Sequence, residues 1–453
     1  MSDTGLIAAG DLDAPFANVA GRLRSRREFI ADASALAERL PASGAMLNLS
    51  LDRYRFAVGF AAALLRGHVS LLPPNHVADT VARLQARFAG VYALVEGDAD
   101  DHDLPSIRHP PGFADGASVD RVPEIDPGLI AAHVLTSGST GDPVPHAKPW
   151  RLLIRNARGE AARLSAALDR ADLRGVTVVA TVPPQHMYGF ESSVLLALHG
   201  GATLDAARPF FPADVAAVLA IAPAPRVLVT TPFHLKTVLD SGLALPPLAL
   251  VLCATAPLSP QLAARAEKRF AAPLLEIYGC TEAGQVATRR TTAGADWRAF
   301  EGVRIEGDGD TVTVSGGHVP QPTVLADVLE VTGEASFRLL GRSSDLINVA
   351  GKRSSIAHLN FHLNSIAGVV DGAFWMPPDN DADGQAVVRL VAFVVAPGVG
   401  RERIVAALRD RVDAAFLPRR IVHVEALPRE ATGKLTAERM AALAARHLRG
   451  EPK

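Results

Sequence analysis

A short segment rich in glycine and hydroxyl side chains lies in the first third of the chain. It reads VLTSGSTGDPVPHAK and follows the strand-like IAAHVL, so a loop begins where a strand ends. Glycines let the backbone approach a ligand closely, and hydroxyl and amide donors can bind phosphate oxygens. The segment predicts a phosphate-binding loop, the alternative being a flexible surface connection. Its candidate ligands are Thr136, Ser137, Gly138, Ser139, Thr140 and Gly141.

Two better-known glycine motifs do not fit the chain. A Walker-type loop needs a glycine five positions before its Gly-Lys pair, and Pro428 stands there ahead of Gly433 and Lys434. A hydrolase nucleophile elbow around Ser139 needs glycine where Ser137 stands. A serine hydrolase therefore remains only as a distant rival.

A second segment, EIYGCTEAGQ, places Thr281 and Glu282 side by side in a glycine-punctuated turn at the end of a strand-like run. Magnesium takes few protein carboxylates and completes its coordination with water and phosphate oxygens, so one glutamate beside a phosphate loop suffices. The alternative is a Thr-Glu pair that caps a helix.

Two further segments carry charged groups suited to a nucleotide. Asp327 and Arg342 could embrace a ribose, the carboxylate accepting from its hydroxyls and the guanidinium donating to its oxygens. Near the C-terminus, LPREATGKL presents Lys434 on a turn at Gly433. The alternatives are an exposed ion pair and a solvated lysine.

Composition narrows the class of protein. The chain has 453 residues, of which 48% are hydrophobic and 21% charged, with a formal net charge of -2. This balance indicates a folded chain of two or three domains and argues against nucleic acid as a partner. Two cysteines, no basic and apolar leader, and no run long enough to span a membrane predict a cytoplasmic enzyme.

Short β-branched runs alternate with helical patterns from Val176 onward, which is an α/β pattern. Ser259 and Pro260 predict the start of a helix over QLAARAEKRF. After Arg342 the pattern becomes α+β, with strands in VVDGAFWMP, QAVVRLVAFVVAP and RRIVHVEALP and a helix near 401–416. We therefore expect a domain boundary at residues 341–344.

The four motifs occur in a specific order: the Thr/Ser/Gly loop, YGxTE, GRxxD with a following GK, and PRxxTGKL. In this order they resemble the adenylate-forming superfamily of acyl- and aryl-CoA synthetases, peptide-synthetase adenylation domains and luciferases. The resemblance implies an α/β fold: a large N-terminal domain with mixed sheets, residues 1–341, and a small mobile α+β C-terminal domain, residues 342–453. It also implies ATP-dependent formation of an acyl-adenylate, followed by acyl transfer to a thiol of CoA or of a carrier protein's phosphopantetheine.

The resemblance assigns roles to particular residues. The loop from Thr136 to Gly141 would bind the ATP phosphates, and Thr140 and Glu282 would place Mg²⁺. Asp327 and Arg342 would bind the ribose, and Lys434 would reach the carboxylate and the α-phosphate. The remaining nucleotide contacts would come from the YGxTE segment, namely Tyr278 against the adenine with Gly279 and Thr281.

The C-terminal domain would rotate between the two half-reactions about a hinge at Ser344, bringing the loop at Gly351 to a thiol tunnel. The chain departs from the family where Val144 follows Pro143 in place of lysine, with Lys148 four residues onward. Contact between the Lys148 side chain and phosphate is therefore doubtful. At the ribose site only the acid of the usual Thr-Gly-Asp is kept.

The segment PPQHMYGFESS resembles the family's acyl pocket, which would be lined by His186, Tyr188, Gly189, Ala254, Thr255 and Ala256. His186 is also a catalytic candidate by this resemblance, against a purely structural histidine. The lack of an obvious aspartate for an amino group favours an aryl or fatty acid. The chain resembles ligases that load hydroxybenzoate-like starters for aryl polyenes. A fatty acyl ligase and a non-catalytic nucleotide-binding regulator remain alternatives.

Overall fold

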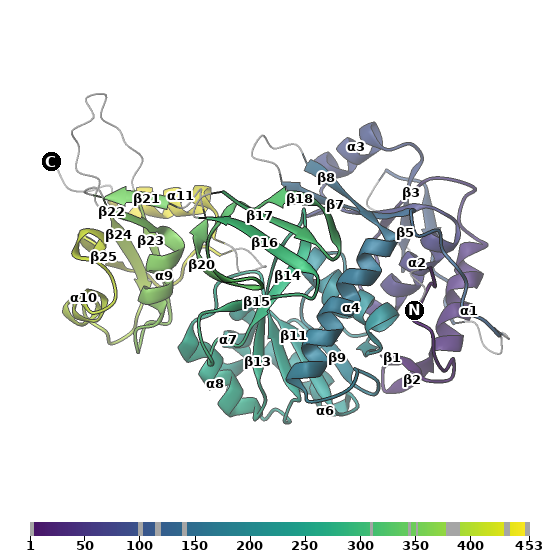
Figure 1. Ribbon diagram of the computed structural model, residues 1–453, viewed down its shortest axis with the longest axis horizontal. Coiled ribbons are helices and arrows are strands. Elements are labelled where there is room, and N and C mark those ends of the chain that lie inside the picture. Colours follow the sequence, from purple (N-terminus) through teal and green to yellow (C-terminus); the bar gives the residue numbers. More distant parts are fainter. Residues whose placement is uncertain are drawn as a thin grey trace.

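The computed structural model describes residues 4–97, 103–113, 119–137, 143–308, 311–342, 346–349, 352–376, 390–429 and 435–448. Two large sheets with helices packed around them form the bulk of the molecule (Figure 1). The α/β fold with mixed sheets predicted from the sequence is confirmed. No helix in these ranges combines the length and the apolar character that crossing a bilayer requires.

The first sheet has eleven strands in the order β19-β20-β15-β14-β13-β12-β11-β9-β10-β1-β2. Strands β9 to β13 run parallel to their neighbours, and β14 turns back antiparallel to β13. In chain order its strands are Pro15–Val19, Arg22–Ser25, Thr177–Ala180, Thr203–Asp205, Arg226–Thr230, Leu250–Cys253, Leu274–Cys280, Gly284–Arg289, Trp297–Ala299, Asp327–Gly333 and Ser336–Arg342.

The second sheet has six strands in the order β6-β5-β3-β4-β7-β8. Its last two strands form an antiparallel hairpin, and the predicted phosphate loop connects them. In chain order these strands are Ala45–Asn48, Val69–Leu72, Val91–Val95, Ser106–Arg108, Ile130–Ser137 and Pro143–Pro149. A separate three-stranded sheet holds β16, β17 and β18, which are Val303–Asp308, Thr311–Gly316 and Val319–Val324.

Helices of this larger part begin where the sequence supplies caps. The Ser259 hydroxyl accepts a hydrogen bond from the Leu262 amide, which confirms the predicted start of α8. The apolar α2 is almost wholly buried, because it packs among both sheets. The helices are α1 Arg26–Ala37, α2 Arg53–Leu65, α3 Ala78–Arg87, α4 Trp150–Ala167, α5 Met187–Gly189, the π-helical η1 Phe190–Gly200, α6 Pro212–Ile221, α7 Pro232–Asp240 and α8 Pro260–Phe270.

The C-terminal residues form a smaller body with its own apolar core beside β20 (Figure 1). The predicted helix over 401–416 is wrong in its second half: α10 ends at Arg409, and Asp413 caps a separate 3₁₀ turn by accepting from the Ala415 amide. The elements are β21 Leu346–Val349, β22 Lys352–Ser355, α9 Ile356–Asn364, β23 Asp371–Trp375, β24 Val391–Val395, α10 Arg401–Arg409, η3 Ala414–Phe416, β25 Arg420–His423 and α11 Ala437–Leu448.

The two bodies meet where β20 ends. The Ser355 hydroxyl donates to the Leu340 carbonyl at 3.0 Å. Gly341 has a φ of +145°, and a Cβ there would lie 2.2 Å from the Ser355 Oγ, so glycine is required for this close approach. The division at residues 341 and 342 stays a prediction.

Candidate active site

The turn containing Thr281 and Glu282 joins β13 to β14, which pair antiparallel. The alternative of a helix-capping pair is therefore excluded. Lys148 on β8 donates from its Nζ to the carbonyl oxygens of Thr281 at 2.5 Å and Glu282 at 3.0 Å. The hairpin that carries the predicted phosphate loop is thus tied directly to the predicted metal-binding turn.

The Glu282 side chain is 46% exposed, and its Oε1 lies 3.9 Å from Nε2 of His146 on β8. Burial lowers the pKa of the His146 imidazole, while the Glu282 carboxylate partly opposes this shift. Sequence reasoning did not select His146. Its place two residues before Lys148 on one strand gives both side chains the same face, a signal visible in the spacing.

The predicted nucleotide residues on β13, β19 and β20 of the large sheet lie together. Asp327 and Arg342 are direct cross-strand partners in the register of β19 and β20. The Tyr278 hydroxyl donates to Oδ2 of Asp327 at 2.7 Å. The Tyr278 ring packs against Trp297 and Phe337, with ring centroids 5.8 and 5.4 Å away. The ribose pair and the predicted adenine-side tyrosine therefore form one cluster, next to Gly279 at a bulge in β13.

A buried layer of polar side chains lies under the turn that carries Thr281 and Glu282. Glu191 on η1 accepts a hydrogen bond from Asn156 on α4 at 2.6 Å, and the Lys148 ammonium interacts with it electrostatically. Burial raises the pKa of the Glu191 carboxyl to about 8, and it raises the pKa of Glu160 on α4 to about 8 as well. Sequence patterns gave no sign of this layer, because its members are brought together only by the packing of α4 against η1.

The predicted acyl-pocket residues follow the ends of parallel strands. Tyr188 is buried, and its hydroxyl donates to the carbonyls of Leu252 at 2.9 Å and Thr230 at 3.2 Å. Its polar end is thus engaged by backbone at the ends of β11 and β12. His186 precedes α5 and is partly buried, and Gly189 ends that helix.

The other pocket segment, Ala254 to Ala256, follows β12 directly. Thr255 adopts a φ of +82°, an unusual conformation for a β-branched residue. Strain of this kind persists where the surrounding structure holds it, and it clusters at binding sites.

A histidine not selected from the sequence lies in the same region. His234 is buried in the first turn of α7, and its Nδ1 is 3.2 Å from the Thr181 hydroxyl, which is 3.0 Å from that of Thr230. Its Nε2 has no hydrogen-bond partner among the described residues. The signal was available: in parallel α/β sheets, ligands bind beyond the carboxyl ends of strands, and His234 follows such an end closely.

Several predicted residues fall outside the described parts of the chain. Thr136 and Ser137 end β7, and Arg342 ends β20. The residues that lie outside are Gly138, Ser139, Thr140, Gly141, Ser344, Gly351 and Lys434.

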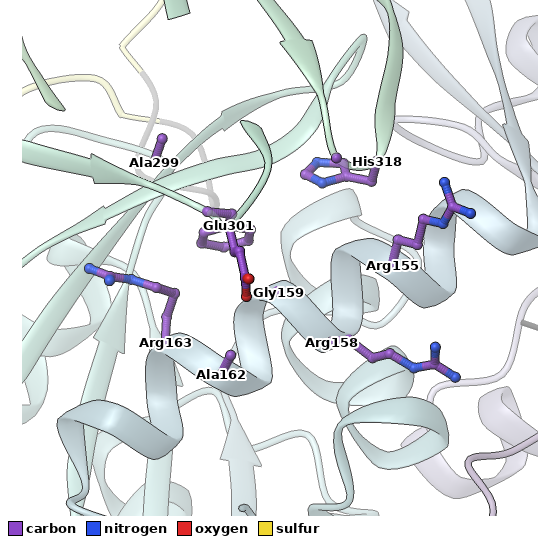
Figure 2. Close-up of a pocket in the computed structure, with 10 residues that line it drawn as sticks. Arg155, Arg158, Gly159, Ala162, Arg163, Ala299, Glu301 and His318 are labelled. Carbon is purple, nitrogen blue, oxygen red and sulfur yellow. The ribbon is translucent and has the colours of Figure 1, made fainter. Parts of the chain in front are cut away.

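A cavity of about 610 Å³ lies between α4 and the segments that follow β15 and β17. Figure 2 shows Arg163 pointing away from Arg155 and Arg158, with the Glu301 carboxylate between them. None of the predicted site residues that the structure describes lines this cavity. It is therefore separate from the cluster described above.

Residues 56–334 match the AMP-binding enzyme family, so the chain belongs to that family. It is 31% identical over 303 residues to a 4-coumarate–CoA ligase of Rhodobacter capsulatus, covering 66% of this chain and 73% of the relative. The fold resembles ATP-bound MatB from Rhodopseudomonas palustris, with a TM-score of 0.78, 18% identity and coverage of 96% and 97% of the two chains.

A second similar structure is o-succinylbenzoate CoA synthetase from Bacillus subtilis with its acyl-adenylate intermediate, with a TM-score of 0.74, 18% identity and coverage of 99% and 96%. These two structural likenesses establish the fold. The protein is an ATP-using, adenylate-forming enzyme of the acyl- or aryl-CoA ligase type, acting on a carboxylic acid.

Proposed function

We propose that this enzyme activates an aryl acid, such as a hydroxybenzoate, and transfers the acyl group to the thiol of CoA or of a carrier protein. The observation that carries the proposal is that β13 and the turn after it join the predicted ribose acid to the β7–β8 hairpin: Tyr278 bonds to Asp327, and the Thr281–Glu282 turn bonds to Lys148. The 31% identity to a 4-coumarate–CoA ligase supports an aryl substrate.

In the first half-reaction, a carboxylate oxygen of the acid attacks the α-phosphorus of ATP. An O–P bond forms as the bond to pyrophosphate breaks. Asp327 would accept from the ribose hydroxyls, held in place by its hydrogen bond from Tyr278. Lys434 would offset the negative charge that develops around the transferring phosphorus.

Glu282 with Thr140 would hold Mg²⁺, which would neutralise charge on the phosphate oxygens. Glu282 fits such a role, because Mg²⁺ can be held by one exposed carboxylate and fill its remaining coordination positions with nucleotide oxygens and water.

In the second half-reaction, the thiol sulfur attacks the acyl carbon, a C–S bond forms, and the C–O bond to AMP breaks. The predicted hinge at Ser344 and the segment at Gly351 would serve this step. His186 and the segment from Ala254 to Ala256 would border the acyl group.

The buried Nε2 of His234 has no hydrogen-bond partner among the described residues, and a hydroxyl on the aryl ring of the substrate would supply one. A neutral hydrogen bond contributes about 1 kcal/mol net, so His234→Leu should reduce the preference for 4-hydroxybenzoate over benzoate by about fivefold. An unchanged ratio of kcat/KM for the two acids would rule out this role of His234.

The deciding experiment is acid-dependent exchange of labelled pyrophosphate into ATP, run across benzoates, cinnamates, fatty acids and amino acids. Lys434→Ala should abolish the exchange. Strongest exchange with a fatty acid would replace the aryl proposal by a fatty acyl ligase, and no exchange with any acid would favour a nucleotide-binding regulator. Repeating the best acid with CoA and with a holo carrier protein identifies the thiol.

A further inference from the structure

The metal-binding turn is held from inside the protein by a lysine that its sequence position does not explain. Lys148 is only 8% exposed, yet it lies on a strand whose next residues enter α4. Two of its three ammonium protons can be assigned to backbone acceptors, the carbonyl oxygens of Thr281 and Glu282. The Lys148 ammonium group therefore binds the backbone of this turn.

A buried carboxyl group lies on the other side of the same turn. Glu191 interacts electrostatically with Lys148, and the backbone amide of Gln285 faces its carboxylate. Gly284 has a φ of +80°, and a Cβ there would lie 2.4 Å from Nδ2 of Asn156 and 3.0 Å from Oε1 of Glu191. The turn thus rests directly on the Asn156–Glu191 pair and has no room to shift toward it.

These contacts fix the backbone on both sides of the Glu282 Cα. The carbonyls before and at Glu282 bond to Lys148, and the chain two residues later is pressed against Glu191. Because the direction of a side chain follows from its backbone, these contacts determine where the exposed Glu282 carboxylate points. Supporting residues of this kind orient metal ligands and change metal affinity when they are removed.

We propose that Lys148 is a positioning residue that, together with the Asn156–Glu191 pair on which the turn rests, aims the Glu282 carboxylate at the metal–nucleotide complex. The inference rests on the proposed function of Glu282 and adds a residue that does not itself touch substrate. It also assigns Lys148 to the turn backbone, in place of the phosphate contact that a lysine in this loop would suggest.

The test is Lys148→Met in pyrophosphate exchange measured across Mg²⁺ concentrations. Exchange should fall about 10–100-fold, and the Mg²⁺ concentration for half-maximal rate should rise about tenfold. Lys236→Met is the matched control, because Lys236 is a surface lysine on α7 paired with Asp240 at 2.5 Å. It should leave both quantities unchanged.

A double-variant cycle separates positioning from general damage. If Lys148 acts through Glu282, Lys148→Met should cost little further exchange once Glu282→Ala is present. Full additivity of the two losses, or an unchanged Mg²⁺ requirement in Lys148→Met, would overturn the proposal. Should Lys148→Met fail to fold, Glu191→Ala removes the side chain on which the turn rests, and its Mg²⁺ requirement must rise for the proposal to stand.

Electron paramagnetic resonance can measure Mn²⁺ binding in the presence of ATP, and this measurement does not require the carboxylic acid substrate. Weaker Mn²⁺ binding by Lys148→Met than by the native enzyme supports the positioning role even where no acid gives exchange. Failure of the proposed acid chemistry and failure of this inference are therefore distinguishable. Equal Mn²⁺ binding by the two proteins would refute the positioning role.

Discussion

Replacing Glu160 with glutamine should weaken the pH dependence of this protein's stability. Glu160 is fully buried on α4, and that burial, reinforced by the nearby Glu191 carboxylate, raises its pKa to about 8 from an ordinary value of 4.5. Ser192 and Gln285 offset part of the shift. Because the folded pKa is the higher one, the folded state holds an extra proton between about pH 4.5 and pH 8. Stability therefore falls as pH rises through that window.

The size of the effect follows from proton linkage. One additional bound proton changes the free energy of unfolding by about 1.4 kcal/mol per pH unit. From pH 5.5 to 7.5 each such carboxyl should remove about 3 kcal/mol of stability, and Glu191 contributes a second, similar loss. Since glutamine cannot ionise, the stability of Glu160→Gln should decrease between pH 5.5 and 7.5 by only about half as much as that of the native protein.

The assay is thermal unfolding at pH 5.5, 6.5 and 7.5, comparing slopes of Tm against pH. For a chain of this size, a difference of about 3 kcal/mol corresponds to a Tm change of about 3–5 °C between the end points. Glu306→Gln, at an exposed position on β16, is the control and should keep the native slope. Identical slopes for Glu160→Gln and the native protein would mean that the buried carboxyl is already ionised, and the reasoning would fail.

Three further substitutions test separate parts of the structure. Tyr278→Phe removes the hydrogen bond to Asp327 and should raise the KM for ATP about tenfold with little change in kcat. The reason is that a hydrogen bond to a charged group contributes about 1.5–3 kcal/mol. An unchanged KM for ATP would contradict this role of Tyr278. Arg429→Ala breaks a two-bond pair with Asp371 at 2.7 and 2.8 Å, so pyrophosphate exchange should fall about tenfold because the segment that leads to the predicted catalytic lysine is misplaced. Native-like exchange would show that the pair does not position this segment. Tyr188→Phe removes two hydrogen bonds to buried carbonyls and should lower the free energy of unfolding by about 1–3 kcal/mol in a urea titration. The KM for ATP should stay unchanged, in contrast to Tyr278→Phe.

Local signals in the sequence predicted the elements and the family. The cap at Ser259, the β-branched runs and the four ordered motifs act over a few residues, where spacing determines geometry. The predicted helix over 401–416 failed because two aspartates past α10 favour turns, and Asp413 begins a separate one.

Contacts between distant segments could not be predicted in the same way. Lys148 is more than 130 residues from the turn it binds. The pairing of Asp327 with Arg342 depends on two bulges that shift the register of β19 and β20. A bulge shifts the pairing of every later residue along the strand, and the residue pattern of β19 and β20 does not predict one. The assigned catalytic and ligand-binding roles remain predictions.

The hydrogen bond from Ser355 to the Leu340 carbonyl spans the predicted hinge, since the two residues lie on either side of Ser344. Rotation of the C-terminal body about that hinge would have to break it. One neutral hydrogen bond contributes about 1 kcal/mol net, which changes the ratio of two orientations only about fivefold. If the C-terminal body rotates as predicted, this bond would therefore favour one arrangement only weakly, and ligands would have enough binding energy to select the other.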